Sequence, residues 1–437
     1  MDKLMREILK QEIERVKLSN NELASIKNFT KKFSDYIDKK IKALGIKASV
    51  YVGGSLAKNT IIRKDKYDID IFIRFDSKYS EEDIKKHMSE IFNWFRIPWH
   101  RFSIKKIRGS RDYYKAIPRF NKNLTFEVIP TLKINNPKEA RNITDLSYFH
   151  VSYIKKKTEE NKGLIEQIIL AKSFCHGQKC YGAESYIGGF SGYALELLLV
   201  YFKDFIKFIE VIAKTHGKIV IDIEKLYKKN EEIIKELNPS KMTSPIILID
   251  PTFKERNAAG ALTQQTFDKF KKACSKFLKS PSMDFFQDKG INTKHFIDTA
   301  KNIDGIFSVF EIQTDKQEGD IAGSKMLKFS KIFVRELNKY FEIIEEEFEY
   351  LGEKEAKIYF VLKRKKEIVF DGPSIHYNEA AENFKKKHKI WYVENGKLKA
   401  AKPNDIKLKE FLDIFRKKFK KIMKEMSITK IKIVKEC

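Results

Sequence analysis

The segment 67–75, YDIDIFIRF, alternates polar or charged residues with large apolar ones. Successive side chains of a β-strand point to opposite faces. A strand here would place Asp68 and Asp70 on one face, about 7 Å apart at the backbone, and bury Ile69 and Ile71 on the other. Neighbouring acids raise each other's pKa, so such a strand needs a counter-charge. The chain is therefore predicted to build a sheet with one apolar face and one face of paired carboxylates.

A divalent cation is the counter-charge that suits this pattern, because paired carboxylates and substrate phosphates are the usual ligands of Mg²⁺. Gly53, Gly54 and Ser55 stand just upstream, where a short strand is expected to meet a helix. Glycines let backbone N–H groups approach a phosphate, and a helix start favours negative charge. A phosphate cradle beside paired carboxylates describes a nucleotidyl-transfer site. The alternative is an exposed strand whose two aspartates bind no metal.

The first 150 residues are predicted to alternate helix and strand. Apolar residues at helical spacing predict helices over 2–18 and 21–44, with Asn20 or Asn21 capping the second. The further elements expected are a strand at 49–52, a helix at 81–95, edge strands within 100–120 and a strand at 124–130 that carries Glu127.

The carboxy-terminal part is predicted to contain small α+β units in series. Strands are expected at 305–312 and 356–362, with a helix at 324–341 between them. Phe411, Phe415 and Phe419 recur every four residues, so they should line the buried face of a helix.

The net charge is strongly positive, since 87 Lys and Arg face 60 Asp and Glu, for a formal charge of +27. Such a surplus indicates an anionic partner, and nucleic acid is the commonest one for a basic protein. The alternative is a lysine-rich composition on solvated surfaces. Basic clusters at 363–366 and 385–389 offer candidate RNA contacts at Lys363, Arg364, Lys385 and Lys386.

Several classes of protein are excluded by composition. With 42% hydrophobic residues, 34% charged residues and few Pro and Gly, the chain is globular rather than fibrous or disordered. Its four cysteines form no CxxC pair, so neither a zinc site nor a disulfide framework is expected. The longest apolar stretch, 193–202, is too short to span a membrane, and the first residues lack the apolar core of a signal peptide. A cytoplasmic protein without membrane contact is expected.

Four strings together resemble known families. Gly-Gly-Ser followed by Asp-Ile-Asp and a later acid is similar to the polymerase-β-like nucleotidyltransferase superfamily. Y-G-A-E and G-F-S-G-Y within 181–193, D-P-T-F-K-E-R-N-A-A at 250–259 and S-P-S-M-D-F-F at 280–286 resemble the archaeal-type (class I) CCA-adding enzymes. The resemblance covers nearly the whole chain.

This resemblance implies an α+β multidomain fold: a catalytic domain at 1–150, a helical middle domain at 151–275 and small RNA-binding domains at 276–437, with an insertion near 335–395. It implies addition of C, C and A to the 3′ end of tRNA from CTP and ATP. It also implies that the protein binds the acceptor stem and the T arm of the tRNA. Two Mg²⁺ ions are implied, with Mn²⁺ as the alternative. The implied catalytic and metal-binding residues are Asp68, Asp70 and Glu127. The implied nucleotide-binding residues are Gly54, Ser55, Lys58, Ser147, His150, Lys172, Tyr181, Asp250 and Arg256, and Arg256 is also an implied RNA contact.

Two positions depart from the family pattern. Glu127 stands where an aspartate is usual, and Ser147 stands where a threonine is expected. For other positions a structural interpretation stays open: Lys172 as a solvated lysine, Tyr181 as a core ring, and Arg256 with Asp250 as a surface ion pair. Two other functions also stay open, a poly(A)- or oligoadenylate-type polymerase and a catalytically inactive tRNA-binding homologue. The sequence leaves the oligomeric state undecided, with a homodimer as one option.

Overall fold

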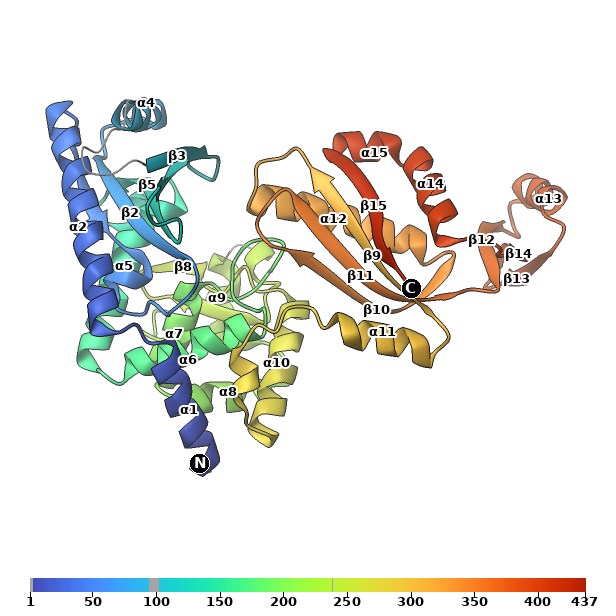
Figure 1. Ribbon diagram of the computed structural model, residues 1–437, viewed down its shortest axis with the longest axis horizontal. Coiled ribbons are helices and arrows are strands. Elements are labelled where there is room, and N and C mark those ends of the chain that lie inside the picture. The colour runs from blue at the N-terminus through green and yellow to red at the C-terminus, as the bar shows by residue number, and fades with distance from the viewer. Residues whose placement is uncertain (1–2, 94–101, 238) are drawn as a thin grey trace. The chain divides into compact units, whose positions relative to one another are not determined.

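The computed structural model describes residues 3–93, 102–237 and 239–437 (Figure 1). Contacts divide the chain into two compact units, Met1–Asp288 and Lys289–Cys437, here named unit 1 and unit 2. The finer division into domains at 1–150, 151–275 and 276–437 stays a prediction. Within the described residues, no helix combines the length and the apolar character needed to cross a membrane.

A five-stranded mixed sheet in the order β1-β2-β5-β4-β3 forms the first part of unit 1. Its strands are β1 (Ala48–Val52), β2 (Tyr67–Asp76), β3 (Phe102–Ile107), β4 (Tyr113–Pro118) and β5 (Leu124–Lys133). β2 runs antiparallel to β1 and parallel to β5, so Asp70 lies in register with Glu127. The strands expected at 67–75 and 124–130 are confirmed. Of the strands expected within 100–120, β3 is an edge, whereas β4 lies between β3 and β5.

The stretch 94–101 lies outside the described residues. It includes the end of the helix expected over 81–95 and the first residues of the expected edge-strand region. The first residue of the helix expected over 2–18 also lies outside them.

Two helices, α2 (Asn20–Ala43) and α4 (Glu81–Phe92), cover the apolar face of this sheet. Phe33 of α2 stacks on Phe126 of β5 with ring centroids 4.2 Å apart. Ile69 and Ile71 of β2 are buried in the same core. The alternation of β2 thus leaves its carboxylates on the face that these helices do not cover.

The cap of α2 differs from the prediction. Ser19 caps the helix instead of Asn20 or Asn21: its hydroxyl accepts from the backbone N–H of Glu22, whose carboxylate accepts from the backbone N–H of Ser19. A capping box requires a Glu or Gln three residues after the cap. Ser19 has this partner and the two asparagines do not.

The rest of unit 1 is mainly helical. Its helices are α1 (Lys3–Val16), α3 (Gly54–Ala57), α5 (Ser147–Glu160), α6 (Leu164–Gly177), α7 (Gly192–Phe202), α8 (Phe205–Lys214), α9 (Asn230–Glu236) and α10 (Gln264–Lys279). Its 3-10 turns are η1 (Pro137–Glu139), η2 (Ile143–Leu146), η3 (Pro239–Lys241) and η4 (Met283–Phe286). A small sheet contains β6 (Ile219–Ile221), β7 (Ile246–Asp250) and β8 (Phe253–Asn257).

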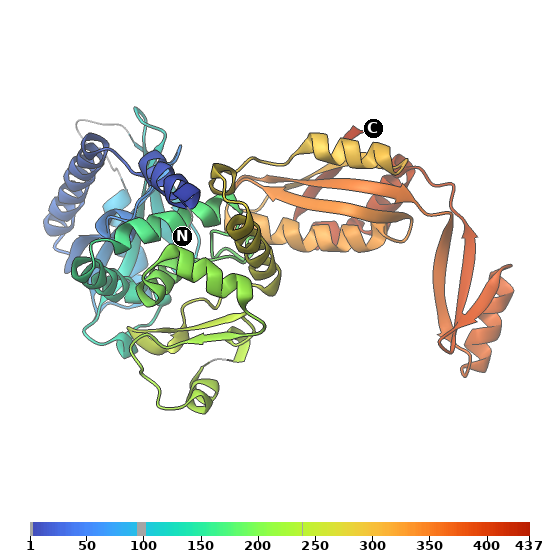
Figure 2. The ribbon, with the colours of Figure 1, turned by 90° about the horizontal axis from the view of Figure 1, so that it is seen from below.

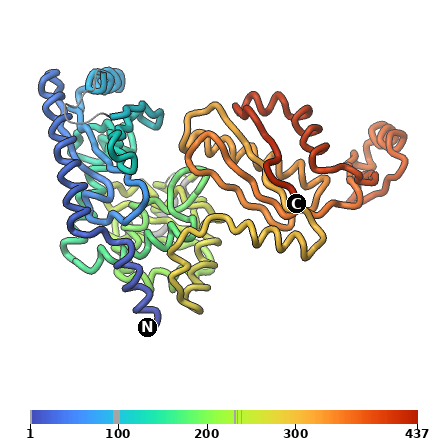
Figure 3. Tube along the Cα trace, viewed as in Figure 1, coloured from blue at the N-terminus to red at the C-terminus, as the bar shows by residue number. Residues whose placement is uncertain are grey.

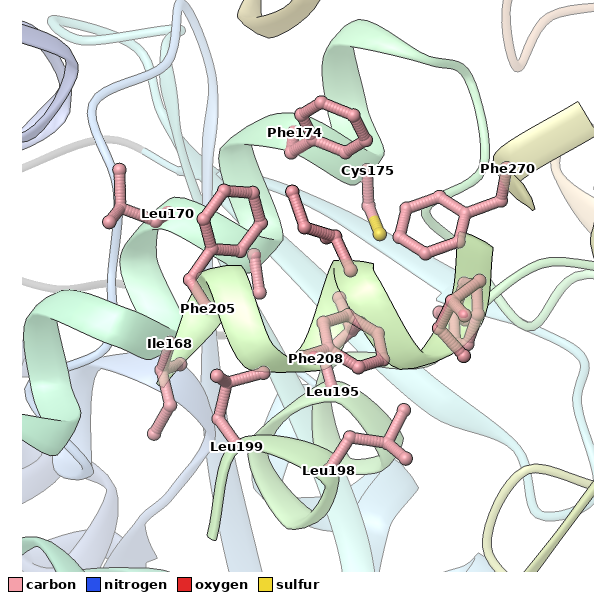
Figure 4. Packing of buried hydrophobic residues seen from close by; sticks show 14 of the residues in the cluster. Ile168, Leu170, Phe174, Cys175, Leu195, Leu198, Leu199, Phe205, Phe208 and Phe270 are labelled. Atoms are coloured by element: carbon pink, nitrogen blue, oxygen red, sulfur yellow. The ribbon is translucent and has the colours of Figure 1, made fainter. Parts of the chain in front are cut away.

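An aromatic core holds this helical layer together. Phe174 of α6, Phe205 and Phe208 of α8 and Phe270 of α10 lie in one buried cluster (Figure 4). The amino-terminal helix α1 lies alongside α6 (Figure 3), where Ser173 donates a hydrogen bond to a buried glutamate of α1. The helical layer and α1 therefore share one core.

Unit 2 is built on an antiparallel sheet in the order β10-β11-β9-β15 (Figure 2). Its strands are β9 (Ile306–Thr314), β10 (Phe341–Tyr350), β11 (Glu355–Arg364) and β15 (Ile428–Glu436). The helices α12 (Asp320–Leu337), α14 (Leu408–Lys418) and α15 (Lys420–Glu425) share one core with the sheet, and α11 (Thr293–Asn302) packs in a second. A smaller sheet holds β12 (Glu367–Ser374), β13 (Trp391–Glu394) and β14 (Lys397–Pro403), with α13 (Asn378–Lys387).

One predicted helix of unit 2 is wrong at its carboxyl end. The helix expected over 324–341 ends at Leu337, and the acidic segment that follows forms β10. β10 is an edge strand, where charged side chains discourage pairing with other chains. The predicted burial of Phe411, Phe415 and Phe419 is confirmed.

Candidate active site

The carboxylates of the first sheet form the centre of the site. Asp68 and Asp70 lie on the same face of β2, and the neighbouring parallel strand sets Glu127 opposite Asp70. Burial, with the charge of Glu127 as the second cause, raises the pKa of Asp70 to about 7. Burial also raises the pKa of Glu127, although Lys115 opposes this shift. Burial therefore disfavours the ionised form of both carboxylates, which a nearby positive charge would stabilise.

Lys115 partly supplies that charge. It lies opposite Glu127 on β4, and its Nζ is 2.8 Å from Glu127 Oε1. Over residues 3–93, 102–237 and 239–437, no three His, Cys, Asp or Glu side chains are gathered as a metal-binding group. The donor chemistry nevertheless fits a hard divalent cation, because carboxylate oxygens are its preferred ligands and Asp68, Asp70 and Glu127 lie on two neighbouring strands.

The Gly-Gly-Ser turn passes directly over Asp70. The backbone N–H of Gly53 donates to the Asp70 carbonyl oxygen at 2.9 Å. Gly54 has φ +60°, and a Cβ at this position would overlap the carboxylate of Asp70. Ser55 follows in the first turn of α3. The glycine is required here by a left-handed backbone and by the approach of the carboxylate.

A buried cluster of charges lies beside the acids. Lys58 Nζ is 2.5 Å from Glu196 Oε2, and Lys172 Nζ is 2.8 Å from Glu196 Oε1. Thr60 donates its hydroxyl to Glu196 at 2.8 Å. Burial alone would raise the pKa of Glu196, but the two lysines outweigh it and the pKa falls to about 2. Both lysines also oppose the upward shift in the pKa of Asp70, so they lie within its electrostatic reach.

This cluster decides whether Lys172 is solvated and adds Glu196 to the site. The solvated-lysine interpretation of Lys172 is wrong, because its side chain is 4% exposed. Glu196 was not singled out by the sequence analysis. The available signal was its isolation as the one charged residue in the apolar helix α7.

A second cluster surrounds Asp250. Its carboxylate accepts hydrogen bonds from Arg256 Nη1 at 2.6 Å and from the Tyr193 hydroxyl at 3.0 Å, and His150 Nε2 lies 3.0 Å away. The His150 and Tyr193 rings stack with centroids 4.1 Å apart. Burial acts to raise the pKa of Asp250, but His150 and Arg256 hold it well below its ordinary range. Arg256 and Asp250 are thus a partly buried pair rather than a surface one.

Two stretches of chain place the residues of this second cluster. β7 ends at Asp250 and β8 carries Arg256, so a tight turn brings the two together. His150 lies in the first turn of α5, and Ser147 begins that helix, one turn before it. The start of α5 is fixed by Asp145, which accepts from Arg111 Nη1 at 2.6 Å and from the backbone N–H of Leu132 at 2.8 Å.

Tyr181 belongs to a third group of residues. Its ring stacks on His176 with centroids 3.9 Å apart, and Lys64 Nζ lies 5.0 Å from the centre of the ring. A Cβ at Gly192 would come within 2.7 Å of the Tyr181 hydroxyl, which explains the second glycine of G-F-S-G-Y. Burial, with the charge of Lys172 next, lowers the pKa of Lys64 to about 8. No pattern in the sequence marks His176 or Lys64 as residues of the site.

The four residues predicted to bind RNA lie in unit 2. Lys363 and Arg364 are exposed at the end of β11. Lys385 and Lys386 lie in the last turn of α13, where Lys385 pairs with Glu382 and lies 5.1 Å from the centre of the Trp391 ring.

Comparison with known proteins agrees with this geometry. Residues 30–162 match the nucleotidyltransferase domain family, and residues 166–287 match the second domain of tRNA nucleotidyltransferases. A mutant of the Cid1 poly(U) polymerase bound to MgATP shares the fold, with a TM-score of 0.51 and 14% identity over 65% of this chain and 99% of that one. The sheet, its acids and the matched domains define a polymerase-β-like nucleotidyltransferase.

Three relatives indicate which kind of nucleotidyltransferase this chain resembles. The CCA-adding enzyme of Nanoarchaeum equitans is 40% identical over 54% of this chain and 57% of its own length. Those of Methanocaldococcus jannaschii and Thermococcus gammatolerans are 27% and 23% identical, over 94% and 89% of this chain and 90% and 85% of their own lengths. The chain is similar over most of its length to archaeal CCA-adding enzymes, and its two family matches are to nucleotidyltransferase domains, the second of them of the tRNA nucleotidyltransferase type.

The overlap at Gly54 leads to a first prediction. Gly54→Ala should lower nucleotide incorporation about 100-fold, because an error of about 1 Å in a reacting group can cost that much. Gly45→Ala is the matched control, since Gly45 has φ +66° but a Cβ there would meet nothing within 4 Å. Single-turnover incorporation into tRNA measures both variants. Equal losses in the two variants would mean that backbone strain, and not the displacement of Asp70, causes the effect.

Proposed function

We propose that this chain adds C, C and A to the 3′ end of tRNA without a template. The tRNA 3′-hydroxyl attacks the α-phosphate of CTP in two successive additions and then that of ATP, and pyrophosphate leaves each time. The observation that carries the proposal is the gathering of paired acids, buried lysines and the Asp250–Arg256 pair in one unit. Relatives named CCA-adding enzymes support the choice of substrates.

Asp68, Asp70 and Glu127 would hold divalent cations, for which we propose two Mg²⁺, with Mn²⁺ as the alternative. When bound, such ions neutralise the charge that develops on the attacking and leaving oxygens. Lys115 pairs with Oε1 of the Glu127 carboxylate, and the second oxygen of this acid would serve a cation.

We assign the triphosphate of the nucleotide to the positively charged side chains and the backbone N–H groups beside Asp70. Lys58 and Lys172 supply the charge, while Gly54 and Ser55 bring backbone N–H groups close to the acids. The ribose and phosphates are proposed to contact Tyr181, His150 and Ser147. Arg256, held by Asp250, is proposed to read the incoming base and to contact the tRNA, because its planar donors can bridge a base and a phosphate.

Selectivity leads to a second prediction. Arg256→Ala should reduce the preference for CTP and ATP over UTP and GTP by about tenfold or more, since the loss of a bidentate contact costs about 1–3 kcal/mol of discrimination. Incorporation of each nucleotide, supplied singly, measures it. Lys254→Ala is the control: Lys254 lies two residues earlier in β8 and pairs with Glu236 at 2.8 Å. Unchanged selectivity in Arg256→Ala would place base reading elsewhere.

The tRNA is proposed to contact unit 2 through its backbone. Lys363, Arg364, Lys385 and Lys386 would bind phosphates of the acceptor stem and T arm. Contacts of this kind are independent of sequence and weaken steeply with salt. They suit an enzyme that serves every tRNA in the cytoplasm.

A primer-extension assay tests the proposed function. It uses tRNA that lacks its 3′-terminal CCA, Mg²⁺, and each nucleotide singly or CTP with ATP. Two additions with CTP alone and a stop after the third with both nucleotides are expected. A long ladder of A would establish a poly(A)-type polymerase instead. Tight tRNA binding without extension in Mg²⁺ or Mn²⁺ would establish an inactive tRNA-binding homologue.

A further inference from the structure

Two buried lysines share one buried carboxylate in unit 1. The side chains of Lys58, Lys172 and Glu196 are 8%, 4% and 0% exposed. Each lysine takes one oxygen of Glu196, at 2.5 and 2.8 Å. Lys172 also donates to the Thr60 hydroxyl at 2.9 Å and to its carbonyl oxygen at 3.3 Å. Both oxygens of the Glu196 carboxylate thus accept hydrogen bonds from lysines, and the two lysines with this one glutamate carry a surplus of one positive charge.

Asp70 lies within the electrostatic reach of both lysines and offsets part of that surplus, and the remainder is costly unless it serves a purpose. A buried charge without a partner is strongly destabilising, and a buried pair needs only one cation for each anion. Neutralising Glu196 would require only Lys172, its neighbour on the adjoining helix. Lys58 comes from the end of α3, next to the glycine turn over Asp70, so it brings the surplus charge to the acids.

We propose that Glu196 is a positioning residue: it clamps Lys58 and Lys172 side by side so that their surplus positive charge receives the triphosphate of the incoming nucleotide. The inference rests on the proposed function and deepens it. Glu196 touches no substrate in this arrangement. It fixes two ammonium groups, one following α3 and one from α6, at the place where an anion must bind.

The alternative is a structural strut that ties α3 to α6 and α7. A strut predicts that removal of either lysine weakens the fold and leaves nucleotide selectivity alone. The proposed role predicts the opposite for Lys58. Its removal leaves Lys172 and Glu196 as a balanced pair, so the protein without nucleotide should be as stable as before or more stable.

Nucleotide affinity and thermal stability of the full-length chain, measured together, test the proposal. The affinities for CTP and CMP are measured with Mg²⁺ and without tRNA. Lys58→Met should weaken CTP binding about 10- to 100-fold, as expected for a lost bond to a charged group, and leave CMP within about threefold. Its unfolding temperature should not fall. Lys42→Met is the charge-matched control, because Lys42 pairs with Asp38 on the surface of α2 and is 74% exposed.

Glu196 is tested by two substitutions. Glu196→Gln should lower both the unfolding temperature and the ratio of CTP to CMP affinity, because the lysines lose their shared anchor. Glu196→Asp should restore part of the ratio, since the carboxylate is retained. An unchanged ratio in Lys58→Met, or a loss of stability in it equal to that of Glu196→Gln, would overturn the proposal.

These outcomes are separable from the test of CCA addition. A chain that extends no tRNA but loses its CTP preference in Lys58→Met and Glu196→Gln would refute the proposed reaction and keep the role of Glu196. A chain that adds CCA while all variants keep the same CTP to CMP ratio would keep the reaction and refute the role.

Discussion

Asp70→Asn should reduce nucleotide incorporation on the order of a thousandfold while tRNA binding stays intact. The substitution keeps the size of the side chain and removes the charge, so the carboxylate pair of β2 loses the member that lies opposite Glu127. tRNA affinity should not change, because none of the residues assigned to tRNA contacts is altered: four lie in unit 2, and Arg256 lies on β8 with Asp250 as its partner. Single-turnover incorporation and filter binding measure the two effects separately.

Asp76→Asn is the matched control for this loss. Asp76 lies six residues further along β2, on the same face, and accepts a hydrogen bond from the backbone N–H of Lys78. It should keep nearly full activity because it lies about 20 Å from Asp70 along the strand. Activity retained in Asp70→Asn would remove Asp70 from the metal site, and equal losses in both variants would point to a general effect of charge on β2.

The central strand and its acids could be predicted because their information is local. Alternation alone assigns Asp68 and Asp70 to one face and Ile69 to the other, since side chains in a strand have a period of two. Burial of Ile69 in the core under α2 and α4 confirms that orientation. Glu127 was recognised as a strand residue, but its register with Asp70 depends on the pairing of two strands far apart in the sequence.

The ion clusters could not be predicted because their members meet only in the folded chain. Lys58 lies 138 residues before Glu196, and Lys172 lies 24 residues before it. A lysine with apolar neighbours is usually a solvated residue, and only the partner from another helix reverses that expectation. The ion pair of Lys115 with Glu127 could not be predicted for the same reason, since it follows from the register of β4 with β5.

The charge of Asp70 should also make the metal-free protein less stable as the pH rises. The pKa of Asp70 is about 7 in the folded chain and has an ordinary value of 3.8, so the folded state keeps a proton that the unfolded state has lost. Stability therefore falls as the pH rises through 7. Between pH 5 and pH 8 this group should cost about 2–3 kcal/mol of unfolding free energy, at about 1.4 kcal/mol for each pKa unit.

Asp70→Asn should abolish that cost, so its stability advantage over the unsubstituted chain should grow from pH 5 to pH 8. Urea denaturation followed by circular dichroism, with a chelator present, measures the difference. The difference is the informative quantity because burial lowers the pKa of His176 to about 3, which acts in the opposite direction near pH 6 and cancels between the two proteins. Mg²⁺ added at pH 8 should stabilise the unsubstituted chain more than Asp70→Asn, since a cation bound to the folded state shifts its stability by mass action. Parallel pH curves and equal responses to Mg²⁺ would mean that the ionised Asp70 is already neutralised by the lysines beside it, and the acids of β2 would then need no metal.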